Sequence, residues 1–281
     1  MMRRNYTAYQ LKWLALITMA IDHFGVLVLL SYTQNATIST FYLIARLIGR
    51  LAFPLFAFMI AEGVYRSRNV LKYWLRLLGM AILIGAGMWA LGLVGIETLA
   101  GNIFVDLSMA AAAMILLKNK NLGIKFLSVL PILYIILTSI SPSLPNYVSA
   151  DYGIYGLVMM LILYLAYTPL PQARILQERF NLFQSAETHR YQVAAILLIS
   201  MHLIWWLLSF IFVDVLTIIN PFTLYLNRFV GAQTYAVISG YFIYAYRGDK
   251  GNPPAWFKVF TYLFYPLHFV ALYLLYYLTT L

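Results

Sequence analysis

Long apolar runs recur along this whole chain of 281 residues, and they constrain its fold more than any other feature. Hydrophobic residues make up 63% of the sequence and charged residues only 10%, with a mean hydropathy of +0.81. A soluble domain is typically about 45–50% apolar and about 25% charged. A helix of about 20 apolar residues crosses a hydrocarbon core of ~30 Å. The sequence therefore predicts a polytopic membrane protein.

Turn signals and charges divide the chain into about nine apolar segments, within a range of about eight to ten. Their hydrophobic spacing near 3.6 residues predicts helices rather than a β-barrel. The expected spans are 11–32, 41–65, 70–95, 103–117, 122–140, 152–167, 191–213, 229–246 and 256–278. We expect an all-α bundle that forms one integral membrane domain over residues 1–281. The first apolar stretch is too long for a signal-peptide core, so it is expected to be an uncleaved span.

The positively charged residues lie almost entirely on one side of these expected spans. One set of loops receives 16 of the 19 Lys and Arg residues, whereas the opposite loops hold Arg228 and the second span contains Arg46 and Arg50. Cytoplasmic loops carry an excess of Lys and Arg, so the N-terminus is expected in the cytoplasm and the protein in the inner (cytoplasmic) membrane. Lipid phosphate then accounts for most of the net charge of +10, and no nucleic-acid partner is expected.

Ionisable side chains interrupt the apolar spans at similar depths. Asp22 and His23 lie in the middle of the first span. With a rise of ~1.5 Å per residue, Arg50 and His268 reach nearly the same level from the second and last spans. Charged groups at this depth are costly, so they pair and mark a functional cavity. Neighbouring helical residues point ~100° apart, so we expect Asp22 to bind Arg50 or Arg46 and His23 to find another partner.

The outer half of the expected bundle holds a second group of charged residues. Arg46 lies one helical turn outward from Arg50, where Asp106 and Asp151 are expected to meet it. These three side chains are candidate substrate-binding residues at the mouth of the cavity. In the alternative interpretation, Asp22 and Arg50 form a structural ion pair that only locates two helices.

Four cations follow the expected cytoplasmic end of the second span, in AEGVYRSRNVLKYWLR: Arg66, Arg68, Lys72 and Arg76. They can hold the inner leaflet, or they can hold the phosphates of an anionic cofactor through charge-assisted hydrogen bonds. No P-loop or GxGxxG pattern accompanies them, so both interpretations stay open. Glu62 is expected to pair with Arg66 at i,i+4 spacing.

A metal site is not expected. Cysteine is absent, which excludes disulfides, thiol catalysis and thiolate ligands. His23, His268 and Asp22 are the nearest approach to a ligand trio, but adjacent residues on one helix point apart. His202 has no ionisable companion in its own span, and we interpret it as a core histidine.

Five stretches in this order and spacing resemble the TraX family, membrane proteins named for acetylation of the pilin N-terminus: LKWLALITMAIDHFG, ARLIGRLAFPLFAFMIAEGVYRSRN, ADYGIYGL, YRGDKG and FYPLHFVALY. The order of the first two is also similar to the wider class of transmembrane acyltransferases. That class uses acyl-CoA from the cytoplasm and modifies acceptors at or beyond the membrane. The resemblance implies that His23 is catalytic and that Arg50 is the arginine of the second helix.

The chemistry of the residues agrees with this implied activity. A histidine takes the proton of an amine or hydroxyl acceptor at neutral pH, and a buried arginine stabilises the carbonyl oxygen as it becomes anionic. We expect acetyl-CoA to bind near Arg66, Arg68 and Lys72, and the acceptor, a protein N-terminus, glycan or lipid, to enter from outside. His23 then acts either as a base or as a transiently acetylated group.

Two other functions use the same residues. A secondary transporter or flippase also needs His, Asp and Arg at the midplane for a proton relay. However, the DHFG and RLAFPLFAF stretches occur once each, without the duplicated halves that many transporters have. In a scaffold or assembly factor, the buried charges would only fix the packing of the helices.

Overall fold

The computed structural model describes residues 5–96, 101–141, 143–167, 186–209 and 232–280. The secondary structure of these residues is helical apart from one isolated β-bridge between Tyr6 and Tyr246, which confirms the expected all-α class. The elements are α1 Ala8–Leu27, η1 Leu29–Tyr32, α2 Ala36–Gly49, α3 Ala52–Arg66, α4 Val70–Leu93, α5 Ile103–Lys118, α6 Leu122–Phe126, α7 Val129–Ile140, α8 Gly153–Leu165, α10 Ala186–Ser209, η3 Ala232–Ile238, α12 Ser239–Tyr244 and α13 Phe257–Thr280.

Five helical stretches in the described part of the chain are long and apolar enough to cross a membrane: Ala36–Arg66, Val70–Leu93, Leu122–Ile140, Arg190–Leu208 and Phe257–Thr279. Each of the nine expected spans contains at least one helix, although the predicted ends at 210–213 and 229–231 lie outside the described residues. The multi-pass helical character is therefore confirmed. The count of nine spans and the cytoplasmic N-terminus stay predictions. The apolar stretch 216–226, where Asn220 and Pro221 suggest a re-entrant or interfacial piece, lies outside the described residues.

The chain divides into two compact units. The first comprises Met1–Phe56, Gln177–Leu207 and Tyr225–Leu281, and the second comprises Ala57–Leu176 and Leu208–Leu224. The expectation of a single domain over residues 1–281 stays a prediction.

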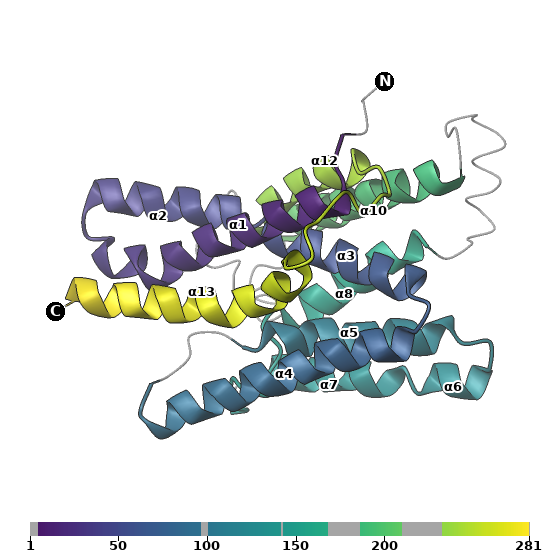
Figure 1. Cartoon of the computed structure of the whole chain (residues 1–281), viewed down its shortest axis with the longest axis horizontal. Coiled ribbons are helices and arrows are strands. Elements are labelled where there is room, and N and C mark those ends of the chain that lie inside the picture. The colour runs from purple at the N-terminus through teal and green to yellow at the C-terminus, as the bar shows by residue number, and fades with distance from the viewer. Residues whose placement is uncertain (1–4, 97–100, 142, 168–185, 210–231, 281) are drawn as a thin grey trace. The chain divides into compact units, whose positions relative to one another are not determined.

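In the first unit, α1 is the central helix. It packs against α2 and against α13 (Figure 1), and η3 contacts α2. The contact between α1 and α13 is apolar and aromatic. Leu16 and Met19 of α1 are buried with Ala52 and Phe257, and the ring of Trp13 lies 5.3 Å from that of Phe257. Burial of aromatic and aliphatic side chains fixes the two helices against each other.

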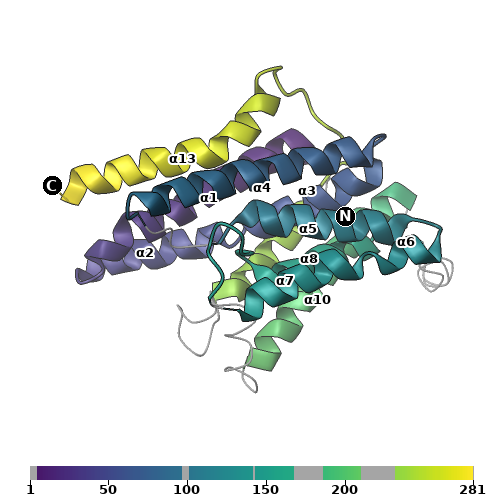
Figure 2. The ribbon, with the colours of Figure 1, turned by 90° about the horizontal axis from the view of Figure 1, so that it is seen from below.

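In the second unit, α5 is the central helix. It packs against α4, α7 and α8, which Figure 2 shows from below. Its small residues Ala110, Ala111 and Ala113 are fully buried. Small side chains let helices approach closely where lipid removes the hydrophobic driving force.

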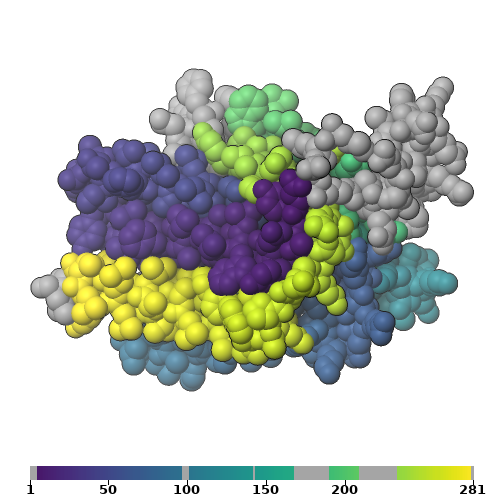
Figure 3. Space-filling model, turned by 45° about the horizontal axis from the view of Figure 1, so that its top comes forward, coloured from purple at the N-terminus to yellow at the C-terminus, as the bar shows by residue number. Residues whose placement is uncertain are grey.

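The start of α1 is attached to the YRGDKG stretch that follows α12. Thr7 and Gln10 form a capping box at the helix start. The backbone N–H groups of Ala8 and Tyr9 donate to the carbonyls of Asp249 and Lys250 at 2.9 and 3.2 Å. Figure 3 shows the first described residues lying against this yellow-green segment.

The expected second span, 41–65, is broken into α2 and α3 at Arg50 and Leu51. The reason is Pro54, which has no N–H to donate to the carbonyl of Arg50 and therefore fits only the first turn of a new helix. Gly49, just before the break, faces Asp22 of α1. A Cβ at position 49 would overlap the Asp22 carboxyl group, so glycine is required for this close approach.

Candidate functional site

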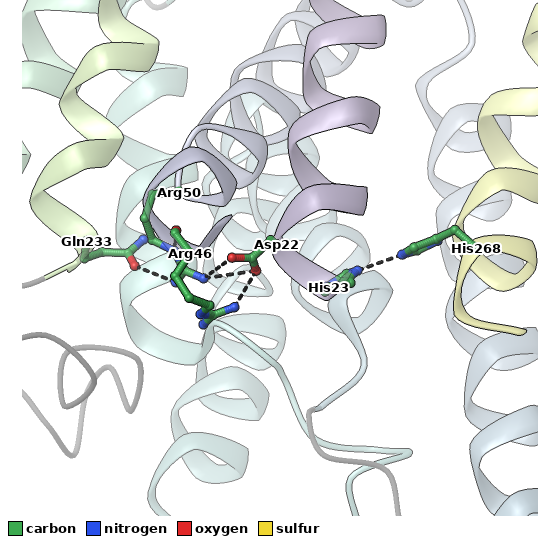
Figure 4. Close-up of polar contacts among 6 residues, drawn as sticks. All are labelled: Asp22, His23, Arg46, Arg50, Gln233 and His268. Atoms are coloured by element: carbon green, nitrogen blue, oxygen red, sulfur yellow. Dashed lines mark hydrogen bonds and ion pairs between the residues drawn. The ribbon is translucent and has the colours of Figure 1, made fainter. Parts of the chain in front are cut away.

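A buried cluster of charges joins α1 to the end of α2 (Figure 4). The Asp22 carboxylate accepts from Nη1 of Arg46 at 2.7 Å and from Nη2 of Arg50 at 2.9 and 3.0 Å. The Arg50 Nε also donates to the Arg46 carbonyl at 3.2 Å. Asp22, Arg46 and Arg50 are all buried, with Arg50 only 2% exposed. The expectation that Asp22 binds Arg50 or Arg46 is confirmed, and the carboxylate binds both.

Gln233 of η3 belongs to the same cluster, and sequence reasoning missed it. Its Oε1 accepts from Nη1 of Arg50 at 3.1 Å, and the residue is 1% exposed. The available signal was weak, because Gln233 is one amide within the apolar segment 229–246. It brings η3 to the charges of α1 and α2, so the cluster is built from three separate elements.

The second cluster is a pair of imidazoles between α1 and α13. Nδ1 of His23 lies 2.7 Å from Nε2 of His268, and Nδ1 of His268 lies 2.8 Å from the carbonyl oxygen of Phe264. The two imidazole rings are stacked, with centroids 5.0 Å apart. The ring of Phe264 stacks on that of His268, with the ring centroids 5.1 Å apart. The centroid of the Phe269 ring lies 4.6 Å from that of each imidazole.

Each cluster contains one residue of α1, and the side chains of these two residues, Asp22 and His23, point away from the helix in different directions. Figure 4 shows Asp22 turned toward the arginines and His23 turned toward His268. This divergence follows from the ~100° between successive helical side chains. The expectation that His23 finds a partner other than Asp22 is confirmed, and the partner is His268.

Two members of the expected outer group, Asp106 and Asp151, lie in the second unit. There, Oδ2 of Asp106 accepts from the backbone N–H of Asp151 at 2.6 Å and of Tyr152 at 3.2 Å, and Oδ1 accepts from Gly153 at 2.8 Å. This fully buried carboxylate caps the start of α8, where Gly153 has a φ of +56°. Asp106 and Asp151 therefore meet, as expected, and in the first unit Arg46 forms an ion pair with Asp22. The acceptor-binding role of Arg46, Asp106 and Asp151 stays a prediction.

Comparison with known proteins agrees with these features. The TraX protein family matches residues 7–183, which is more than half of the chain. This chain belongs to the TraX family. It is also similar to the probable fimbrial assembly protein FimC, serogroup H1, of Dichelobacter nodosus, with 29% identity over 172 residues. The alignment covers 58% of this chain and 64% of FimC, which is less than two thirds of that relative. No solved structure matches.

In this TraX-family chain, the expected cofactor-binding cations surround the connection from α3 to α4. Arg66 and Glu62 form the expected i,i+4 ion pair, with Nε and Oε1 3.0 Å apart. Arg68 and Lys72 are exposed. The guanidinium of Arg76 lies 5.9 Å from the centre of the Tyr73 ring, and its buried Nε has no hydrogen-bond partner among the described residues. This group can bind an anionic ligand by charge, which leaves its role a prediction.

His202 of α10 behaves as a core residue. His202 is 1% exposed, and its Nδ1 bonds to the Leu198 carbonyl one turn earlier in α10 at 2.8 Å. Among the described residues, no three His, Asp or Glu side chains are close enough together to hold a metal ion.

Proposed function

We propose that this protein is a membrane-embedded acetyltransferase that moves an acetyl group from cytoplasmic acetyl-CoA to an amine or hydroxyl at or beyond the membrane. The observation that carries the proposal is the His23–His268 pair, at 2.7 Å, between two helices of a multi-pass membrane protein. Membership of the TraX family and similarity to a protein named for fimbrial assembly support a pilin N-terminus as the first acceptor to test. A cell-surface glycan or polymer is the second acceptor.

In this proposal His23 is the general base. The nitrogen or oxygen of the acceptor attacks the thioester carbonyl while its proton passes to the imidazole of His23. The C–S bond then breaks, and CoA leaves as a thiolate that takes the proton back from the imidazolium. Bases of this kind work best near the operating pH, and an imidazole meets that condition at neutral pH.

The arginine cluster has two roles in the proposal. The two guanidinium groups that bind Asp22, the residue before His23, would supply positive charge as the carbonyl oxygen becomes anionic. The cluster also ties α1 to α2 and η3, so that the helix carrying His23 is held in position. Asp22 is then a positioning residue for the arginines.

The topology that we propose has nine spans, a cytoplasmic N-terminus and a location in the inner membrane. The basic connection from α3 to α4 then faces the cytoplasm, where acetyl-CoA is available. Arg66, Arg68, Lys72 and Arg76 would contact the phosphates of acetyl-CoA by charge-assisted hydrogen bonds.

The experiment that tests the function is transfer of radiolabelled acetyl groups from acetyl-CoA in membranes that contain the protein. We expect labelling of an added pilin or of an endogenous surface polymer, with release of one CoA for each acetyl group transferred. Membranes without the protein serve as the control. Dissipation of a pH gradient or solute uptake without CoA release would support the transporter instead. The absence of both would leave a scaffold role and overturn the proposal.

The cofactor site is tested by reversing two exposed charges. We expect Arg68→Glu with Lys72→Glu to raise the KM for acetyl-CoA by ~10-fold or more, because two phosphate contacts become repulsive. Arg66 is left unchanged, since its replacement would also break the ion pair with Glu62. KM is measured with detergent-solubilised protein at a saturating acceptor concentration.

The matched control is Lys120→Glu with Lys125→Glu, two exposed or half-exposed cations near α6 that give the same change in net charge. This control should leave the KM for acetyl-CoA close to that of the unmodified protein. Equal KM values for the Arg68/Lys72 variant and the unmodified protein would reject the cofactor role and support contact with lipid phosphate.

A further inference from the structure

The hydrogen bonds around His268 determine where its proton lies. The carbonyl oxygen of Phe264 has no hydrogen to donate, so Nδ1 of His268 must be the donor in the 2.8 Å bond between them. A neutral imidazole carries one N–H, and its other nitrogen is an acceptor. Nε2 of a neutral His268 therefore accepts.

The surroundings favour the neutral form of His268. The residue is 8% exposed and lies among aromatic rings. The Phe264 ring stacks on its imidazole at an interplanar angle of 14°, and the ring centroids of Tyr265 and Phe269 lie 5.6 and 4.6 Å from that of the imidazole. Among the described residues, no carboxylate forms an ion pair with it. Charge is costly in such an apolar environment within a membrane-spanning helix.

The same reasoning then fixes the proton of His23. Its Nδ1 faces the accepting Nε2 of His268 at 2.7 Å, so Nδ1 of His23 must donate. A neutral His23 consequently has its lone pair on Nε2. No hydrogen bond to that atom is present among the described residues, and His23 is only half-buried.

We propose that His268 is a positioning residue that holds His23 in the Nδ1–H tautomer, so that Nε2 of His23 is the basic nitrogen. The chain of bonds runs from His23 Nδ1–H to His268 Nε2, and from His268 Nδ1–H to the Phe264 carbonyl. Its end is a carbonyl, which orients the two rings as the third group of a triad orients a catalytic histidine. The inference rests on the proposed function for the role of Nε2, but the tautomer itself can be observed without any activity.

The tautomer is tested by NMR of the whole protein in lipid, with ring-¹⁵N histidine, at neutral pH. The sequence contains four histidines, and the His23 signals are assigned from their loss in a His23→Gln sample. We expect His23 to carry its proton on Nδ1 and to have a bare Nε2. In His268→Phe, the tautomer with the proton on Nε2 should gain population. A His23 ring that carries its proton on Nε2 in the unmodified protein would overturn the inference, whatever the activity.

The role in catalysis is tested by two substitutions of different shape. The amide oxygen of His268→Gln can take the place of the accepting Nε2, whereas His268→Phe fills the space without an acceptor. We expect His268→Phe to lower kcat about 10²-fold or more with little change in KM for acetyl-CoA, and His268→Gln to recover most of kcat. His202→Gln in α10 is the matched control, which should leave the His23 signals and kcat unchanged.

The outcomes separate the two proposals. The expected tautomer together with a protein that transfers no acetyl groups would overturn the proposed function but leave the assignment of His268. Transfer with equal kcat in His268→Phe and the unmodified protein would overturn the positioning role. A second outcome would also overturn the positioning role: both His268 variants fold and keep the His23 tautomer, yet both lose kcat. The loss would then not depend on whether the residue at position 268 offers a hydrogen-bond acceptor.

Discussion

Replacement of His23 by alanine is expected to lower acetyl transfer by ~10²–10⁴-fold while the protein still inserts and folds. The imidazole is the base in the proposed reaction, and alanine offers no group that can take the proton of the acceptor. His23 is only half-buried, and it pairs with His268 and aromatic rings rather than with the charge cluster. Its removal therefore leaves the ion pairs of Asp22 in place. The measurement is kcat for acetyl transfer at equal amounts of folded protein.

His202→Gln is the matched control for this substitution, because His202 is also a buried histidine within an apolar helix, and its Nδ1 bonds to the Leu198 carbonyl of its own helix. Its kcat should equal that of the unmodified protein. Transfer that survives in His23→Ala would remove His23 from the reaction and, with it, the observation on which the proposed function depends.

Replacement of Asp22 by alanine is expected to destabilise the fold by ~3–5 kcal/mol, which is the usual cost of removing one partner of a buried ion pair. The carboxylate binds Arg46 and Arg50 together, and both arginines are at least as deeply buried as Asp22. Without it, two guanidinium groups stay in an apolar environment with their principal counter-charge removed. Thermal unfolding in a mild detergent, followed by circular dichroism, measures the loss.

A triple variant separates the structural contribution of this cluster from its chemical one. Asp22→Leu, Arg46→Leu and Arg50→Leu together remove all three charges, so they should recover most of the lost stability. Acetyl transfer should stay low, because the positive charge near the reacting carbonyl is gone. A triple variant with full activity would show that the cluster only locates the helices. An Asp22→Ala protein as stable as the original would contradict the ion-pair geometry.

The depth of the polar residues could be predicted from the sequence because a helix rises by a constant amount per residue. That rule placed Asp22, His23, Arg50 and His268 at one level, and the structure joins them as two contacting sets. The divergence of Asp22 from His23 was equally predictable, since it depends only on the angle between adjacent helical residues.

The sequence did not predict which residue of another helix some of these polar side chains would contact. A constant rise does not say which face of one helix meets which face of another, so the pairing of His23 with His268 was not predicted. Gln233 was missed for the same reason, as a single amide in an apolar segment gives no indication of the charge that it meets. Asp106 illustrates a further limit, because its partners are backbone N–H groups, which every residue except proline carries.

The break between α2 and α3 could have been predicted and was not. Pro54 disfavours a continuous helix through Arg50, yet the unbroken hydrophobicity of 41–65 suggested a single span. Hydropathy reports whether a segment can lie in lipid, and it does not report whether its backbone hydrogen bonds are continuous.

The attachment of α1 to the segment before α13 has a consequence for the register of these helices. Residues 5–9 at the start of α1 hydrogen-bond to the segment 245–250, and α13 begins after this segment, at Phe257. The two helices run side by side in the same direction (Figure 1). The two imidazoles therefore face each other only because a fixed number of residues separates each histidine from this shared segment. An extra residue inserted into either helix would turn one ring by ~100° and shift it by ~1.5 Å, and the rings would no longer meet.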